Sequence, residues 1–196
     1  MTRIISSLAE VSASYDALFC DLWGCLHNGK QPFPAAVAAL QAFRAQGGQV
    51  CLMTNAPRPN QYVIAQLDRM GVPRDAWDLV VSSGIIASGP FDELNETPED
   101  YRDRFQGAVD RGLPMLCANP DIVVDMGETR IYCAGALADF YQSLGGTALY
   151  YGKPHAPIYD RARALMGLGP DARYLAVGDG IATDIAGAEA QGIDSI

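Results

Sequence analysis

The sequence predicts a three-layer α/β fold, in which a parallel sheet lies between helices and a small α/β segment is inserted. Short apolar runs alternate with amphipathic helical segments over residues 1–84, the pattern changes over 85–145, and the alternation resumes at 146–196. Of the 196 residues 49% are hydrophobic and 19% are charged, which is enough apolar material for a buried core. We therefore expect a core domain at 1–84 and 146–196, with an inserted cap domain at 85–145.

The first half of the core reads as strand, helix, strand, helix, strand. The apolar runs are short and end in polar residues, which is typical of strands buried on both faces of a parallel sheet. Pro34 opens an alanine-rich helix, and Gly47 with Gly48 ends it. The predicted elements are strands at 17–22, 49–53 and 79–81, the last running into Ser82-Ser83-Gly84, and helices at 35–46 and 60–70.

The inserted segment has its own helix and strand signals. Gly89-Pro90 breaks the chain, and Thr97 with Pro98 looks like an N-cap followed by a first-turn proline. A small α/β unit fits this pattern. Its predicted elements are a helix from 97 to 111, strands at 113–118, 122–124 and 129–133, and a helix at 136–144.

The last part of the chain resumes the core pattern. A fourth core strand is expected to end just before Lys153, and a fifth at 174–177. Helices are predicted at 157–166 and 184–190, and the chain stops inside or just before a further strand.

Composition excludes several classes of function. Fourteen Lys and Arg against 23 Asp and Glu give a formal net charge of −9, which opposes binding to nucleic-acid backbones and anionic membranes. No apolar stretch reaches the length of a membrane span, and the N-terminus lacks the apolar run of a signal peptide. The five cysteines show no zinc-like spacing, which indicates buried free thiols in a reducing compartment. We expect a cytoplasmic protein without nucleic-acid or membrane partners.

Polar residues gather at the predicted strand ends, where parallel sheets bind ligands. Carboxylates brought together without a cation repel one another, so three aspartates at such ends invite a metal ion, and all-oxygen ligation suits Mg²⁺. A lysine beside them could hold a phosphoryl group, with neutral donors from the second strand. The residues concerned are Asp21, Thr54, Asn55, Lys153, Asp179 and Asp184.

Each of these residues also has an ordinary structural interpretation. A single Asp at a strand end is most often a helix cap or turn former, and a single Lys is most often solvated. Thr54-Asn55 would also serve as a plain loop start. The order and spacing of the whole set favour one shared site.

The motifs resemble those of the haloacid dehalogenase (HAD) superfamily, in the subclass with an α/β cap (IIA) and its sugar-phosphatase-like branch. Gly29, Pro34 and Asn55-Ala56-Pro57 also resemble that branch. The insert is short for such a cap. The segments that carry the resemblance are Asp21-Leu22-Trp23-Gly24-Cys25-Leu26, Met53-Thr54-Asn55, Gly152-Lys153-Pro154, and Gly178-Asp179-Gly180 through Thr183-Asp184.

The resemblance implies a Rossmann-like core and a Mg²⁺-dependent phosphotransfer. Asp21 would attack phosphorus and form an aspartyl phosphate that water releases, while Thr54 and Lys153 hold the phosphoryl oxygens. The resemblance also implies residues that hold the metal and cap loops that face the site. These are Asp21, the main-chain carbonyl of Trp23, Asp179 and Asp184 for the metal, and Asn119-Pro120-Asp121 and Ala134-Gly135-Ala136 for the loops, with Asn55 and Asn119 as substrate-binding residues.

One residue departs from the family pattern. Phosphatases of this superfamily carry a second Asp two residues after the nucleophile as the general acid, and this chain has Trp23 there. Losing a general acid costs about 10² to 10⁴ in rate, or roughly 3 to 5.5 kcal/mol of barrier. His27 is either a substitute acid or a histidine between core and cap. Activity is therefore expected to be weak and to favour aryl or acyl phosphates.

Three functions remain open on the sequence. The first is a phosphatase acting on a small phosphorylated metabolite, with a sugar phosphate as one candidate substrate. The second is a catalytically quiet protein that binds a phosphorylated ligand, which Trp23 favours. The third, carbon–halogen cleavage, fits less well with Lys153, Asp179 and Asp184 together. A homodimer is left open as a partner.

Overall fold

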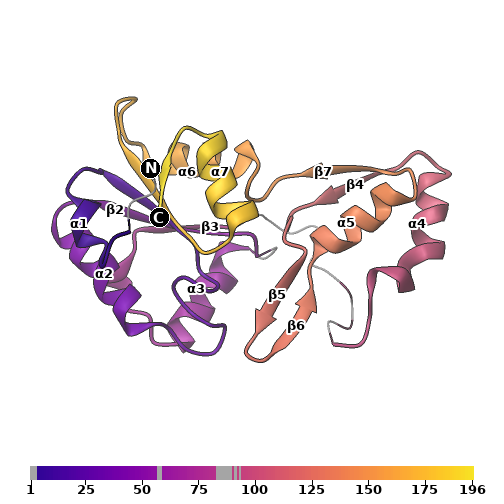
Figure 1. Cartoon of the computed structure of the whole chain (residues 1–196), viewed down its shortest axis with the longest axis horizontal. Coiled ribbons are helices and arrows are strands. Elements are labelled where there is room, and N and C mark those ends of the chain that lie inside the picture. Colours follow the sequence, from indigo (N-terminus) through magenta and orange to yellow (C-terminus); the bar gives the residue numbers. More distant parts are fainter. Residues whose placement is uncertain (1–3, 57–58, 83–89, 91, 93) are drawn as a thin grey trace.

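The computed structural model describes residues 4–56, 59–82, 90, 92 and 94–196. Figure 1 shows two parts side by side: a sheet with helices above and below it, which contains both chain ends, and a second part formed by the middle of the chain. Predictions that fall on Pro57, Ser83-Gly84, Gly89 and the division between residues 84 and 85 lie outside the described residues.

The core is a five-stranded parallel sheet with the order β3-β2-β1-β8-β9. Of the three central strands, β1 and β2 are almost wholly buried and β8 is buried at its two middle residues, which explains why their sequences are continuous apolar runs and not alternating ones. The strands are β1 (Ala17–Cys20), β2 (Gln49–Thr54), β3 (Leu79–Ser82), β8 (Tyr174–Val177) and β9 (Asp194–Ser195). The parallel sheet confirms the predicted α/β class.

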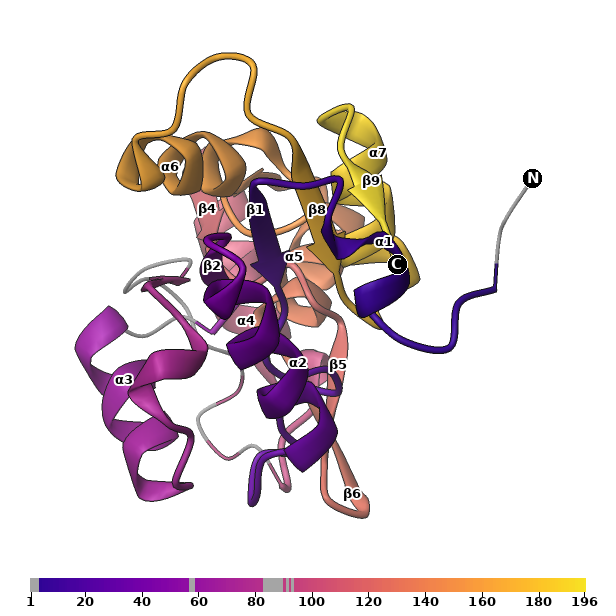
Figure 2. The same cartoon turned by 90° about the vertical axis from the view of Figure 1, so that its left-hand side faces the viewer.

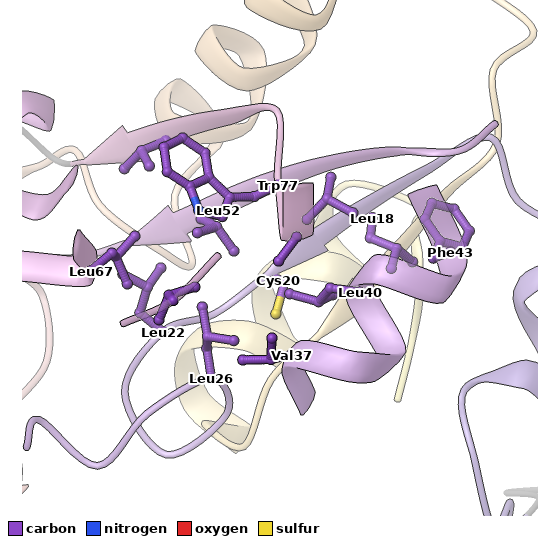
Figure 3. Close-up of a cluster of buried hydrophobic side chains, with 14 of the residues drawn as sticks. Leu18, Cys20, Leu22, Leu26, Val37, Leu40, Phe43, Leu52, Leu67 and Trp77 are labelled. Atoms are coloured by element: carbon purple, nitrogen blue, oxygen red, sulfur yellow. The ribbon is translucent and has the colours of Figure 1, made fainter. Parts of the chain in front are cut away.

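Helices cover both faces of this sheet and make the three predicted layers. Side chains of α2 (Pro34–Ala45) and α3 (Asn60–Arg69) pack with inward residues of the strands, such as Leu18 and Leu52, on one face (Figure 3). The opposite face is covered by α6 (Ala156–Met166) and α7 (Ala186–Ala190) (Figure 2). A short helix, α1 (Ala9–Ser12), precedes the first strand and packs at the edge of the first cluster.

The structure shows how single residues start and end one helix, and where another begins. Pro34 occupies the first turn of α2, where its missing N–H has no partner to lose, and Gly47 follows the helix with φ +93°. The last helix begins later than predicted: α-helical geometry starts at Ala186, and Ile181–Ile185 forms a π-helical turn before it.

The middle of the chain forms a second, smaller α/β unit, the cap. A 3₁₀ turn at Pro98–Tyr101 starts with the predicted cap at Thr97, whose side chain and that of Asp100 form a reciprocal capping box. The elements that follow are α4 (Arg102–Val109), β4 (Pro114–Cys117), β5 (Val123–Met126), β6 (Thr129–Tyr132) and α5 (Ala134–Ser143). β5 and β6 form an antiparallel hairpin on the side of the cap that faces the core (Figure 1).

The strand before Lys153 corrects one prediction. β7 (Thr147–Tyr150) pairs in parallel with β4, and the two form a separate two-stranded sheet. The sequence placed this strand in the core sheet, but the position beside β1 is taken by β8. The chain therefore returns from the cap along β7 and enters the core only at Gly152 and Lys153. The boundary at residue 145 itself stays a prediction.

Candidate active site

The site begins where the central strand ends. Asp21 directly follows β1, and its backbone N–H donates to the carbonyl of Val177 at 2.8 Å, so the sheet ladder continues to this residue. β1 lies between β2 and β8, which end in Thr54 and in Gly178-Asp179. Parallel strands bring their carboxyl ends to one edge, and the three motifs meet there as predicted.

Three carboxylates form a cluster at this edge. Asp21, Asp179 and Asp184 each offer an oxygen, and these atoms lie within 4.8 Å of one another. Asp21 and Asp184 are buried, whereas Asp179 is exposed at the mouth of the site. Gly24, at φ +78°, lies against the Asp179 carboxylate so closely that a Cβ at this position would overlap it. The turn after Asp21 therefore needs glycine for its backbone conformation and for the space that the Asp179 carboxylate occupies.

The π-helical turn places Asp184. The N–H of Ile185 reaches back five residues to the carbonyl of Gly180 at 3.1 Å, which widens the turn. The Asp184 side chain then lies over Gly178, and its Oδ2 accepts a hydrogen bond from the Gly180 N–H at 3.1 Å. Single π turns of this kind are frequent at functional sites.

Lys153 joins two members of the acid cluster. Its Nζ lies 2.5 Å from Asp21 Oδ1 and 2.5 Å from Asp184 Oδ1, and all three side chains are at most 10% exposed. A buried cation between two buried anions satisfies charges that would each be costly alone. Two of the three carboxylates thus already have a positive partner, and each keeps a second oxygen.

Burial dominates the protonation of this cluster. It raises the pKa of Asp21 to about 7, an effect that Asp184 increases and that the Lys153 ammonium only partly offsets. For Lys153 itself, burial lowers the pKa, but Asp21 and Asp184 outweigh it, and the net pKa is raised. Lys153 is therefore a permanent cation in this site.

Asn55 fixes the segment that carries Lys153. Its Oδ1 accepts a hydrogen bond from the Lys153 N–H at 2.6 Å, and its Nδ2 donates to the Lys153 carbonyl at 3.1 Å. The same Nδ2 donates to Asp121 Oδ1 at 3.0 Å. Asn55 was predicted as a substrate-binding residue. The structure shows its amide organising the site by connecting the core to the cap.

Thr54 is buried at the end of β2, and its Oγ1 accepts the N–H of Ala56 at 3.1 Å. This bond uses one lone pair of the hydroxyl, whose hydrogen is a donor for other groups. Thr54 lines the same cavity as Asp21 and Lys153. Its predicted contact with a phosphoryl oxygen stays a prediction.

The site opens into a cavity of about 700 Å³ between the core and the cap. The cap lines it with the loop at Asn119 and Asp121 and with the β5–β6 hairpin, whose contribution is mostly apolar. The hairpin residues concerned are Val123, Val124, Asp125, Met126, Gly127, Ile131 and Tyr132. The predicted Asn119 is buried, and its Oδ1 accepts the N–H of Asp121 at 3.2 Å.

Trp23 and His27 pack together in the turn that follows Asp21. Their rings lie 5.3 Å apart edge to face, and the indole also covers Gly29, where a Cβ would overlap it. His27 is 1% exposed, its Nδ1 accepts the Gly29 N–H at 3.1 Å, and burial lowers its pKa. Trp23 lines the cavity but His27 lies outside its lining. The position of His27 does not support it as a substitute acid.

The donor set of the cluster fits a hard divalent cation. Mg²⁺ takes oxygen ligands at about 2.0–2.1 Å in an octahedron, and oxygens within 4.8 Å of one another match such a ligand sphere. Asp21, Asp179 and Asp184 are the carboxylates in question. The Trp23 carbonyl stays a predicted fourth ligand.

The sequence did not predict two features of the site. Asp121 was noted only as part of a cap loop, yet its carboxylate reaches a core side chain. The hairpin was predicted as strands, but no pattern in the sequence indicated which face it would turn to the cavity. The available signals for the loop were the family resemblance and the position of Asn119 and Asp121 just after a predicted strand.

Two models of known protein families match parts of the chain. A model of the haloacid dehalogenase-like hydrolase family matches residues 18–97, and a second model, described as HAD-hydrolase-like, matches 150–196. Among curated proteins none matches the chain. None of the described helices is long and apolar enough to cross a membrane.

Solved structures of other proteins share this fold. A glycerol phosphate phosphatase from Mycobacterium tuberculosis in complex with magnesium is 22% identical, with 94% of this chain and 68% of that chain covered and a TM-score of 0.72. A 4-nitrophenylphosphatase from Thermotoga maritima is 19% identical, with 94% and 86% covered and a TM-score of 0.74. At these identities the likeness shows the fold alone.

A third solved structure carries more weight. It is a hydrolase of the haloacid dehalogenase-like family from Brucella suis 1330, which is 39% identical, with 98% of this chain and 88% of that chain covered and a TM-score of 0.92. Since identity at this level extends over nearly the whole chain and the two family models match residues 18–97 and 150–196, the chain belongs to the haloacid dehalogenase-like hydrolase family.

Proposed function

We propose that the chain is a Mg²⁺-dependent phosphatase that acts on a small phosphorylated metabolite through an aspartyl phosphate on Asp21. One observation carries the proposal: a buried carboxylate, a buried lysine and two further acids meet at the mouth of one cavity. This set can attack a phosphorus atom, neutralise the charge on its oxygens and hold a cation. A solvated surface cluster would have neither the buried lysine nor the cavity.

The chain's own residues divide the work. Asp21 uses one carboxylate oxygen as the nucleophile, and Lys153 and Thr54 hold the oxygens of the phosphoryl group. Asp21, Asp179 and Asp184 would hold Mg²⁺, together with the predicted Trp23 carbonyl. When bound, the ion supplies positive charge to the phosphoryl oxygens and offsets the repulsion between phosphate and carboxylates.

The cavity bounds the substrate. Its volume of about 700 Å³ suits a small metabolite, and the mostly apolar hairpin wall leaves the polar contacts to the core and to the cap loop at Asn119 and Asp121. Two structurally similar proteins are described as a glycerol phosphate phosphatase and a 4-nitrophenylphosphatase, which supports a phosphate monoester. A sugar phosphate is one candidate.

Trp23 sets the expected substrate order. An indole cannot protonate a leaving group, so aryl and acyl phosphates, which need little protonation, should turn over faster than alkyl phosphates. The predicted weakness is thus a weakness toward poor leaving groups. Equal turnover of p-nitrophenyl phosphate and an alkyl phosphate would contradict this reasoning.

The decisive experiment follows phosphate release from a panel of phosphorylated metabolites with Mg²⁺ present. Asp21→Asn serves as the blank, because it keeps the size of the side chain and removes the nucleophilic oxygen. We expect release that depends on Mg²⁺ and is lost in this variant. Release that persists in Asp21→Asn would reject the mechanism.

A catalytically quiet phospho-ligand-binding protein is the second candidate, and Trp23 favours it. Acetyl phosphate or beryllium fluoride separates the two, because only a competent nucleophile takes up a phosphoryl group or its mimic. Modification of Asp21 detected by mass spectrometry supports the phosphatase. Tight ligand binding with neither modification nor turnover supports the binding protein.

A further inference from the structure

The reaction proposed above requires a proton donor for the leaving group. Trp23 occupies the usual position of that donor, and His27 is buried outside the cavity lining. Two described carboxylates of the cap line the cavity, those of Asp121 and Asp125. Asp125 is exposed and forms a two-fold hydrogen-bonded pair with Arg130, at 2.7 and 3.0 Å, which holds it as a carboxylate.

Asp121 is held in place from both sides of the cavity. Its N–H donates to Asn119 Oδ1 at 3.2 Å, and its carbonyl accepts the N–H of Gly135 at 3.0 Å. A Cβ at Gly135 would overlap the carbonyl of Pro120, so the start of α5 lies directly against this loop. On the core side, Asn55 Nδ2 donates to Asp121 Oδ1. The loop geometry and one side-chain bond therefore fix the carboxyl group.

The second carboxyl oxygen of Asp121 has a different environment. In the described part of the chain, Oδ2 has no hydrogen-bond partner, and the residue lines the cavity into which the substrate must fit. Burial is the main influence on the group and raises its pKa, Lys153 and the Asn55 bond act in the opposite direction, and Asp184 and Asp179 raise it further. These are the charged groups that face it, and together with burial they leave its pKa above the ordinary value.

We propose that Asp121 is the catalytic acid and base that Trp23 cannot be. In the first step Asp21 forms a bond to phosphorus, the bond from phosphorus to the leaving oxygen breaks with its electron pair on that oxygen, and Asp121 gives this oxygen its proton. In the second step the Asp121 carboxylate takes a proton from water while the water oxygen bonds to phosphorus. The bond between phosphorus and Asp21 then breaks, and Asp121 is protonated again.

The inference rests on the proposed phosphatase function, and the test separates the two. Turnover is measured for p-nitrophenyl phosphate, whose leaving group is stable as an anion, and for glycerol 3-phosphate, whose leaving group needs a proton. The proteins are the wild type, Asp121→Asn, Asp121→Glu and the matched control Asp125→Asn. The two substrates form the same aspartyl phosphate, so kcat/KM, which reports on the first step, is compared. The ratio of the two kcat/KM values within one preparation does not depend on the fraction of folded protein.

Asp121→Asn is expected to lose about 100-fold or more in kcat/KM for glycerol 3-phosphate and less than about 10-fold in kcat/KM for p-nitrophenyl phosphate. Asp121→Glu should retain part of the glycerol 3-phosphate turnover. Asp125→Asn should leave the ratio unchanged. Adding Trp23→Asp to Asp121→Asn should restore turnover of glycerol 3-phosphate, because it returns a carboxyl group to the usual position.

Other outcomes overturn the inference. Equal losses on both substrates in Asp121→Asn would make Asp121 a structural link between cap and core through Asn55. A selective loss in Asp125→Asn would assign the proton to the other cap carboxylate. A wild type that turns over p-nitrophenyl phosphate but not glycerol 3-phosphate would show that no donor acts at all. A wild type inactive on both substrates would instead reject the proposed function.

Discussion

Replacing Lys153 by Met tests the charge balance of the site. The change keeps most of the length of the side chain and removes its charge, which leaves Asp21 and Asp184 buried without their shared cation. Breaking a buried ion pair by removing one partner costs about 3–5 kcal/mol, because the remaining charge stays desolvated. We expect the free energy of unfolding to fall by this amount at neutral pH in the absence of divalent metal.

The size of this effect follows from burial, and the chain contains a matched comparison. Arg130 and Asp125 form an ion pair at 2.7 Å whose side chains are 68% and 58% exposed. Water screens an exposed pair of this kind, so Arg130→Met should cost far less stability than Lys153→Met. The two variants differ mainly in how much water surrounds the pair.

Urea unfolding with EDTA, followed by circular dichroism, measures both variants against the wild type. Saturating Mg²⁺ should then reduce the loss of stability in Lys153→Met, since a cation between the carboxylates replaces part of the missing charge. A ligand at 100 times its Kd stabilises the folded state by about 2.7 kcal/mol. A loss below about 1 kcal/mol in Lys153→Met would refute the reasoning. It would mean that the acids protonate or reach water without cost.

Three further changes test other parts of the site. Gly24→Ala should weaken Mg²⁺ binding, measured by calorimetry, at least about tenfold, because its Cβ would overlap Asp179. Gly71→Ala is the control: Gly71 has a similar φ of +77° but open space around it, so this change should affect only stability. The free energy of unfolding of Asp21→Asn, measured with urea in the absence of metal, should rise relative to that of the wild type as the pH increases from about 4 to about 7. The expected relative gain is at least about 1 kcal/mol. Trp23→Asp should raise kcat on alkyl phosphates, as measured by phosphate release.

The sign of the pH effect follows from the raised pKa of Asp21. Its ordinary value is 3.8 and its value in the fold is about 7, so the folded state binds the proton more tightly than the unfolded chain does. Its contribution to stability is complete below the ordinary value and is lost as the pH rises toward 7. A constant difference between Asp21→Asn and wild type over this range would contradict the burial argument.

The other two changes have equally direct contradictions. Unaltered Mg²⁺ affinity in Gly24→Ala would mean that Asp179 does not hold the ion. No gain in Trp23→Asp would mean that protonation of the leaving group does not limit the reaction.

The sequence alone determined the core fold and most of the site. Strands buried on both faces leave continuous apolar runs, and Pro34 and Gly47 mark helix ends through their backbone chemistry, so these signals are local. The clustering of Asp21, Thr54 and Asp179 was equally predictable, because all parallel strands end at the same edge. The three-layer order followed from these two properties.

Tertiary structure alone decided which strand β7 joins and which cap groups reach the site. A four-residue apolar run has the same sequence pattern whichever strand it pairs with. Its partner depends on which sheet edge is free, and β8 already occupies the edge of β1, so β7 pairs with β4. The contact of Asp121 with Asn55 joins residues 66 positions apart, and it exists only because the cap folds back over the core. The raised pKa of Asp21 likewise depends on the packing that surrounds it, since desolvation is a property of the assembled interior and not of the residues beside it in the chain.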